Sequence, residues 1–318
     1  MKQRKFWLWA IALSLVGLLI CGGLVGLGLW AAGSSQDGAL PFTDAVALVR
    51  VEGAIVPGEA PPPNPFLAGS GGMAYSETIV DYLKRANEDE TIKAVVLFVD
   101  SPGGSVFASD EIYLQIKQMN KPVIAAMGSL AASGGYYISA PAAEIWASPH
   151  TLTCSIGVIM QLINLEGFAE EYGVTAVVVK SGQFKDIGNP FREFTEADRA
   201  ILQSMIDEAY TAFVKIVAEG RNIPEDRVRA IADGRICSGR QAQQMGLVDQ
   251  LGYLDDVIKR AGELGNIPGE PRVVEYGKET GFWEALGAAL YRPSPIQELR
   301  DVLHFNAGSP LMYLYVGP

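Results

Sequence analysis

The chain has 318 residues, a net charge of −11 and a pI of about 4.8. This acidity argues against nucleic-acid binding, because a phosphate-binding surface needs clustered Lys and Arg. The three cysteines, Cys21, Cys154 and Cys237, fit no C-x-x-C metal or redox pattern. A Cys154–Cys237 disulfide is conceivable but not expected, since sequence alone cannot place two sulfur atoms together.

The first 32 residues have the composition of a membrane anchor. Three basic residues precede an uncharged, mostly apolar run over residues 6–32. A membrane-spanning helix needs roughly 20 apolar residues, whereas the apolar core of a secretory signal peptide has roughly 7–15. The run therefore predicts a single-pass anchor, with a signal peptide cleaved near Ala31-Ala32-Gly33 as the alternative. Basic residues favour the cytoplasmic side, so we expect a cytoplasmic N-terminus, a linker over residues 33–44 and an extracytoplasmic remainder.

Beyond the linker, strand-like and helix-like stretches alternate. In chain order we predict a strand at 45–51, a Gly- and Pro-rich loop at 57–73, a helix at 76–87, a buried strand at 92–99, a loop at 100–105 and a helix to about 119. There follow a strand at 122–127, a helix beginning near 133, strands at 144–147, 158–161 and 174–179, and helices at 195–217, around 230, at 238–245 and at 254–264. This alternation predicts an α/β layered fold, and no internal repeat is visible.

Two of the predicted strands end in small-residue loops. The first loop, Asp-Ser-Pro-Gly-Gly-Ser at 100–105, is either a simple strand-to-helix turn or an oxyanion hole, in which Gly103 and Gly104 let a substrate carbonyl reach bare backbone amides. In the second loop, small residues surround Ser133 and leave room for a peptide to reach its hydroxyl. Ser133 also stands where a helix should begin, so a plain N-cap is the alternative.

A serine hydroxyl needs a base to become a nucleophile at neutral pH. The chain has two histidines: His150 follows a Ser-Pro turn and His304 lies in the tail. The G-x-S-x-G and S-x-x-K patterns are absent, which disfavours the α/β-hydrolase and penicillin-binding-protein arrangements. The remaining candidate is a lysine whose pKa is lowered by burial. Lys185 is the best candidate because Phe184 and Ile187 flank it, although a solvated loop lysine is the alternative.

Five motifs resemble, in order, those of the SppA-type signal peptide peptidases, which are membrane-bound serine peptidases of the ClpP/crotonase-like fold. The resemblance covers residues 45–265 and rests on DSPGGS at 100–105, MGSLAASGGYYI at 127–138, TCSIGVI at 153–159, KSGQFKDI at 180–187, and ADGRICSGRQA at 232–242 followed by GLVD at 246–249.

The resemblance implies a role for each matching residue. Ser133 is similar to the family's nucleophile, Lys185 to its general base and Ser155 to the serine that orients the lysine amine. The amides of Gly103 or Gly104, with Gly134, correspond to the oxyanion hole. Cys154 is a departure, because glycine is expected there.

The implied protein is a membrane-anchored endopeptidase with a Ser–Lys dyad, acting on apolar peptides such as remnant signal peptides. Residues 45–265 would form the catalytic domain, built from repeated β-β-α units, and copies would assemble into a homo-oligomeric ring with sites near the subunit interfaces. No cofactor, metal or nucleic acid is expected. The alternatives are a related peptidase acting on other membrane proteins, an acyl-CoA enzyme of the same fold and a catalytically silent membrane scaffold.

Residues 266–318 form a predicted C-terminal arm. Its apolar end, LMYLYVGP at 311–318, either packs on a neighbouring subunit or occupies a peptide groove of its own or another copy.

Overall fold

The computed structural model describes residues 43–61, 73–277 and 312–314, and all the described helices and strands belong to the unit Asp44–Pro318. Within these ranges no helix combines the length and apolarity needed to cross a bilayer. The predicted anchor over residues 6–32 lies outside the described residues.

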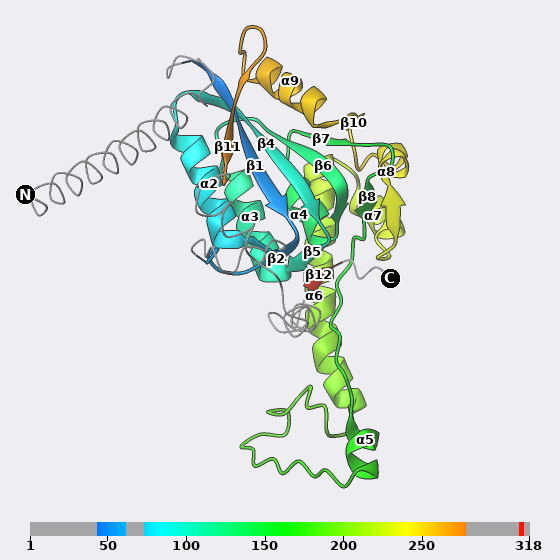
Figure 1. The fold of residues 1–318 in the computed structure, drawn as a ribbon. Coiled ribbons are helices and arrows are strands. Elements are labelled where there is room, and N and C mark those ends of the chain that lie inside the picture. Colours follow the sequence, from blue (N-terminus) through cyan, green and yellow to red (C-terminus); the bar gives the residue numbers. More distant parts are fainter. Residues whose placement is uncertain (1–42, 62–72, 278–311, 315–318) are drawn as a thin grey trace, which may run out of the picture. The chain divides into compact units, whose positions relative to one another are not determined.

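The centre of the fold is a twisted sheet of eight strands (Figure 1). Its main path runs β10-β7-β6-β4-β1-β11 with parallel pairing throughout, and β8 pairs parallel with the far end of β6 while β9 runs antiparallel to β8. The strands are β1 (Ala45–Glu52), β4 (Ile92–Ser101), β6 (Val123–Ala132), β7 (Glu144–Ala147), β8 (Leu152–Cys154), β9 (Ile236–Ser238), β10 (Gln250–Leu251) and β11 (Arg272–Tyr276). The prediction of an α/β fold with a parallel sheet is confirmed.

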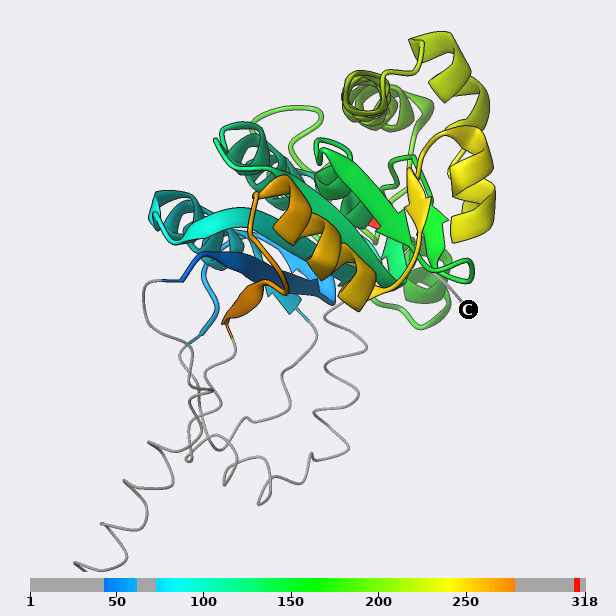
Figure 2. The same cartoon turned by 90° about the horizontal axis from the view of Figure 1, so that it is seen from above.

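Helices cover both faces of this sheet, so its central strands are buried on both sides (Figure 2). Alternate residues of each strand point to opposite faces. Val46 and Leu48 pack with Val257 of α9 (Leu254–Leu264), whereas Ala47 and Val49 belong to a larger cluster on the other face. That larger cluster is covered by α2 (Ser76–Glu88), α3 (Val106–Lys117), α4 (Gly134–Ser139) and the second half of α6 (Glu196–Arg221).

A second sheet of four short strands adjoins the ends of β1 and β4. Its order is β12-β5-β2-β3, formed by β12 (Met312–Leu314), β5 (Gly103–Ser105), β2 (Ala54–Val56) and β3 (Met73–Tyr75). The glycine pair predicted as a loop is therefore a strand. The C-terminal β12 runs antiparallel to β5, with Tyr313 opposite Gly104.

Residues 159–208, which we call the extension, leave the body formed by the two sheets and their helices (Figure 1). The extension contains α5 (Glu166–Glu171) and the first half of α6, and the chain returns through α7 (Glu225–Ile231), β9 and α8 (Gly239–Met245). The strands predicted at 158–161 and 174–179 are wrong, because no strand forms at either place. Val177 and Val179 are 84% and 96% exposed, so this β-prone segment has no strand beside it to pair with.

Candidate active site

Ser133 lies at the sharp turn between β6 and α4. Its backbone has φ 53° and ψ −115°, a conformation that side-chain-bearing residues rarely adopt, and the residue is 1% exposed. Its N–H donates to the carbonyl oxygen of Cys154 at 2.9 Å, and its carbonyl accepts from the N–H of Tyr137. The hydroxyl makes no capping bond to α4, so the N-cap alternative does not account for this serine.

Three glycine backbones converge beside Ser133. A Cβ on Gly103 would lie 2.5 Å from the nitrogen of Gly134, and a Cβ on Gly134 would lie 3.1 Å from the nitrogen of Gly104. Gly103 also has φ 98°, which favours glycine. Its N–H already donates to the hydroxyl of Ser101, whereas the N–H of Gly134 opens a helix and has no partner within that helix. Of the three predicted donors, Gly134 is therefore better placed than Gly103, whereas Gly104 lies on β5 between β12 and β2.

Ser155 follows β8 directly and is separated from Ser133 by the Cys154 carbonyl. Its φ is 51°, its N–H donates to the carbonyl of Arg235 at 2.8 Å, and the residue is 7% exposed. It lines an open cavity of about 520 Å³ between the root of the extension and residues 232–234. The structure thus brings together Ser133, Ser155 and the glycines.

Lys185 lies in the extension, in the segment between α5 and α6. It is exposed, and its backbone N–H donates to Gly182 in a turn. In the part of the chain that the structure describes, no hydrogen bond joins its side chain to Ser133 or Ser155. The predicted base and the predicted nucleophile therefore belong to different parts of the fold in a single copy.

An ion-pair network fixes the segment that carries Lys185. The guanidinium of Arg192 binds both carboxylate oxygens of Asp198, at 2.6 and 3.1 Å, and also contacts Asp186, which pairs with Lys180 at 2.7 Å. The hydrogen bond from Arg192 holds the pKa of Asp198 well below its usual range, while Lys180 and Arg192 lower the pKa of Asp186. Asp198 also completes the capping box of α6 with Thr195.

An aromatic cluster beside the glycines holds the C-terminal strand. Tyr313 is fully buried, its ring centroid lies 4.8 Å from that of Tyr137 and 4.7 Å from that of Phe213, and its hydroxyl donates to the carbonyl of Ala209. Burial raises the pKa of both tyrosines, so their hydroxyls stay neutral. The cluster is thus an apolar pocket that accepts a large side chain from a strand paired to β5.

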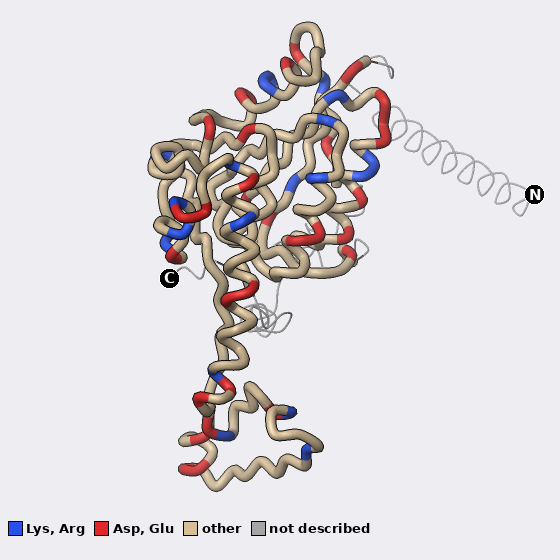
Figure 3. The backbone as a smooth tube through the Cα atoms, turned by 180° about the vertical axis from the view of Figure 1, so that it is seen from behind, with Lys and Arg blue, Asp and Glu red and all other residues tan. Residues whose placement is uncertain are grey.

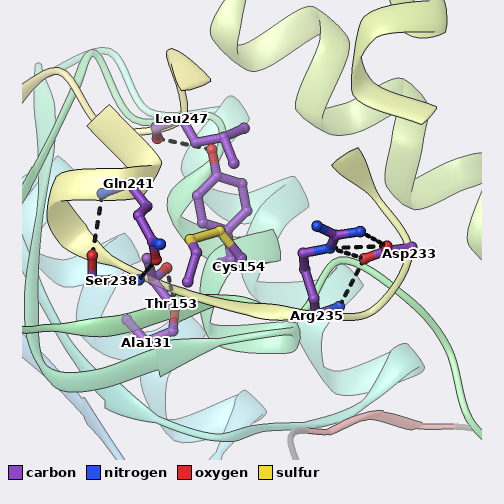
Figure 4. Close-up of a disulfide and its surroundings, with 10 residues drawn as sticks. Ala131, Thr153, Cys154, Asp233, Arg235, Ser238, Gln241 and Leu247 are labelled. Atoms are coloured by element: carbon purple, nitrogen blue, oxygen red, sulfur yellow. Dashed lines mark hydrogen bonds and ion pairs between the residues drawn. A yellow bond between two sulfur atoms is a disulfide. The ribbon is translucent and has the colours of Figure 1, made fainter. Parts of the chain in front are cut away.

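A disulfide joins Cys154 to Cys237 and ties β8 to β9 (Figure 4). The expectation of unpaired cysteines is therefore wrong. The antiparallel register sets Thr153 opposite Cys237 and Cys154 opposite Ile236, which leaves the two cysteines one residue apart across the ladder. That register could not be derived from the sequence, although a cysteine in place of the expected glycine was a signal.

Two protein-family models match parts of this chain. The model of peptidase family S49 matches residues 115–267, which include Ser133, Ser155 and Lys185, and the Clp protease model matches residues 66–153.

Similar proteins come from distant organisms. A candidate protease of Methanocaldococcus jannaschii is 41% identical over 63% of this chain, and the match spans 65% of that relative. A candidate signal peptide peptidase SppA of Enterococcus faecium is 40% identical over 76% of this chain and 74% of the relative. Protease 4 of Haemophilus influenzae is 33% identical over 81% of this chain, but the match spans only 44% of that relative. The chain therefore belongs to peptidase family S49 and is a serine-type peptidase.

Proposed function

We propose that this peptidase is a membrane-anchored endopeptidase that cleaves apolar peptides, such as remnant signal peptides, with Ser133 as nucleophile and Lys185 as general base. The observation that carries the proposal is the strained turn at Ser133, which adjoins the amides of Gly104 and Gly134 on one side and Ser155 on the other. A related membrane peptidase with other protein substrates is the alternative.

The chemistry needs proton transfers at two atoms. The neutral amine of Lys185 takes the proton of Ser133 Oγ as that oxygen attacks the peptide carbonyl, and the glycine amides stabilise the negative oxygen that forms. The lysine then gives the proton to the leaving amine. A water molecule attacks the resulting ester with the lysine again acting as base, which restores the serine.

The base is supplied by a second copy of the chain. A lysine acts as a base near neutral pH only when burial lowers its pKa, yet Lys185 is exposed within one copy. The cavity that Ser155 lines is open, so an amine from a neighbouring molecule has a route to it. In a homo-oligomeric ring, the extension of one copy would bring Lys185 to the Ser133 and Ser155 of the next.

The apolar surface of the extension supports such an assembly. Of the 21 large hydrophobic residues that are exposed in the described part of the chain, 14 lie between Ile159 and Met205. Exposed apolar patches of this kind mark interaction surfaces. Figure 3 shows acidic and basic residues in the same region, and several of them already form ion pairs with one another within one copy.

The C-terminal strand supports the choice of substrate. A peptide bound as β12 is, antiparallel to β5, would gain main-chain hydrogen bonds beside the glycines. Its large apolar side chain would enter the pocket formed by Tyr137 and Phe213, which Tyr313 fills in the single chain. Extended apolar peptides fit this arrangement better than charged ones.

The disulfide supports an extracytoplasmic position for the catalytic domain, because disulfides persist in oxidising compartments. Together with the apolar run at residues 6–32, it favours a single-pass protein of a bacterial-type cell membrane with its N-terminus in the cytoplasm. Fractionation of the full chain and of a chain beginning at residue 33 tests the anchor: the full chain should sediment with membranes and the shortened one should not.

The catalytic proposal is tested with four variants and a fluorogenic apolar peptide. Ser133→Ala and Lys185→Ala should each abolish cleavage. Ser129→Ala and Lys180→Ala are the matched controls, because they remove the same functional groups nearby and should retain cleavage. Activity that survives in Lys185→Ala would sink the dyad, and activity that survives in Ser133→Ala would sink the nucleophile.

A further inference from the structure

We propose that the Cys154–Cys237 disulfide is a positioning element of the active site, which holds Cys154 in the conformation that fixes both Ser133 and Ser155. The inference rests on the proposed function, since it assigns a role to a bond beside that same site. It concerns cysteines that take no part in the proton transfers.

The backbone of Cys154 connects the two serines. Its carbonyl oxygen accepts the N–H of Ser133 at 2.9 Å, and its carbonyl carbon is bonded to the nitrogen of Ser155. A rotation of this one peptide would move the acceptor away from Ser133 and turn Ser155 at the same time. The position of both hydroxyls therefore depends on the backbone of Cys154.

That backbone is not in a relaxed conformation. Cys154 has φ 66° and Ser155 has φ 51°, and Ser133, whose N–H donates to the carbonyl of Cys154, has φ 53°. Residues with a side chain occupy this left-handed region at a cost, and they stay there only when their surroundings hold them. Three such residues, with Cys154 connected to each of the two serines, require a firm restraint.

The disulfide and its neighbours supply this restraint. Cys154 and Cys237 are 3% and 5% exposed. Beside them, the hydroxyl of Thr153 donates to the carbonyl of Ala131 on β6, and Ser238 and Gln241 form the capping box of α8 (Figure 4). The sulfur bridge thus connects a strand anchored on the main sheet to a strand anchored by a helix.

The same bond joins the two ends of the segment that carries the base. Cys154 and Cys237 are 83 residues apart, and the loop that they close contains the whole extension with Lys185. Residues 232–234, which precede β9, also line the cavity next to Ser155. Without the bridge, β8 and β9 would be held together by a ladder of three residues on each strand.

Two variants separate a positioning role from simple stabilisation. Cys237→Ala removes the bridge and leaves a strained side chain at position 154. In Cys154→Gly/Cys237→Ala the bridge is also absent, but glycine adopts a positive φ without strain. Both variants lose the same covalent link, so a purely stabilising bridge predicts that both lose the same activity.

The experiment measures kcat and KM for an apolar peptide, and the rate at which a fluorophosphonate labels Ser133, on the full-length protein. We expect Cys237→Ala to lower kcat and the labelling rate roughly 10-fold to 100-fold with KM little changed, because small misplacements of a nucleophile have effects of this size. The double variant should recover most of that loss. A dithiol, which is oxidised to a disulfide as it reduces the bridge to two thiols, should slow the natural protein and leave the double variant unaffected.

Each failure has its own signature. If Ser133 is not labelled in the natural protein, or if Ser133→Ala still cleaves the peptide, the proposed function is wrong. If Ser133 is labelled normally but neither Cys237→Ala nor the dithiol changes kcat, the positioning role is wrong. Equal losses of kcat in both variants would mean that the bridge only stabilises the fold. Should Cys237→Ala not fold, the natural protein reduced by the dithiol takes its place in the comparison with the double variant.

Discussion

The body and the extension bury their apolar residues to very different degrees. In the body, Val46, Val95 and Ile124 are fully buried between helices, and Ser133 is held by hydrogen bonds on both sides. In the extension, Val177 and Val179 are almost entirely exposed, at 84% and 96%. In the proposed mechanism, the part of the site that contains Ser133 is therefore complete within one copy, whereas Lys185 would be covered only by a second copy. Adjacent motifs in a sequence need not form one site in one chain.

The strongest test of whether Ser133 and Lys185 of one site come from different copies is to restore activity by mixing two inactive variants. Ser133→Ala retains Lys185 and Lys185→Ala retains Ser133, so a ring that contains both will hold some sites with an intact serine from one copy and an intact lysine from the next. Random mixing at equal amounts in a cyclic oligomer gives about a quarter of the natural number of sites. We expect each variant alone to be inactive and the co-expressed pair to regain about that fraction.

The control for mixing is the double variant Ser133→Ala/Lys185→Ala co-expressed with Ser133→Ala, which should regain nothing. Two different affinity tags, purified in sequence, show that mixed oligomers have formed. Mixed oligomers without activity would mean that serine and lysine must come from the same copy.

A substitution in the core of the body should lower the free energy of unfolding far more than one on the surface of the extension. Phe213→Ala removes a fully buried ring and should lower the free energy of unfolding by about 3–5 kcal/mol. Val177→Ser in the extension should change the stability of a single copy by less than about 0.5 kcal/mol but should weaken assembly. Urea unfolding measures the first effect and light scattering after size-exclusion chromatography the second. A large loss of stability in Val177→Ser, with assembly unchanged, would mean that the extension packs on its own body.

The layering of the body could be predicted because its strands are long and continuously apolar. Residues 92–99 and 122–127 are buried on both faces, and such runs indicate a parallel sheet. The same pattern gave a wrong prediction at 174–179. A high β-propensity means that a residue fits a pleated, half-buried surface, and this segment is exposed in a single copy. Strands of three residues, such as β5, β9 and β12, are too short to show a period.

Part of the site could also be predicted from the sequence, and part could not. Ser133 and Gly103 follow neighbouring parallel strands, β6 and β4, whose carboxyl ends meet at one edge of the sheet. Their convergence therefore follows from chain order. Lys185 follows no strand, so its place relative to Ser133 could not be inferred. The Cys154–Cys237 bridge depends on the register of two short strands, which no local pattern specifies.

A third test concerns the strand that fills the peptide pocket. Deletion of residues 307–318 removes β12, and Tyr313→Ala empties the aromatic pocket while keeping the chain length. If β12 competes with substrate, kcat/KM for a short apolar peptide should rise in both variants, roughly tenfold if self-occupancy is favourable by about 1.4 kcal/mol. Leu152→Ala, at an exposed position of β8, is a control that should have no effect. Unchanged activity toward short peptides in both variants would exclude the groove.

The smallest expected effect is a loosening of the extension in acid. Arg192 holds the pKa of Asp198 below its usual range, so the pair contributes stability above the ordinary Asp pKa of about 3.9 and loses it as the pH falls from there towards the lowered value. Hydrogen exchange in residues 160–200, corrected for its intrinsic pH dependence, should be constant between about pH 5 and 8 and should rise below about pH 4. Asp198→Asn should show the faster exchange already at pH 6, whereas Asp207→Asn, at an exposed carboxyl of the same helix, should match the natural protein. If hydrogen exchange rose equally in the body and the extension, the Arg192–Asp198 pair would not stabilise the extension specifically, because the body does not depend on this ion pair.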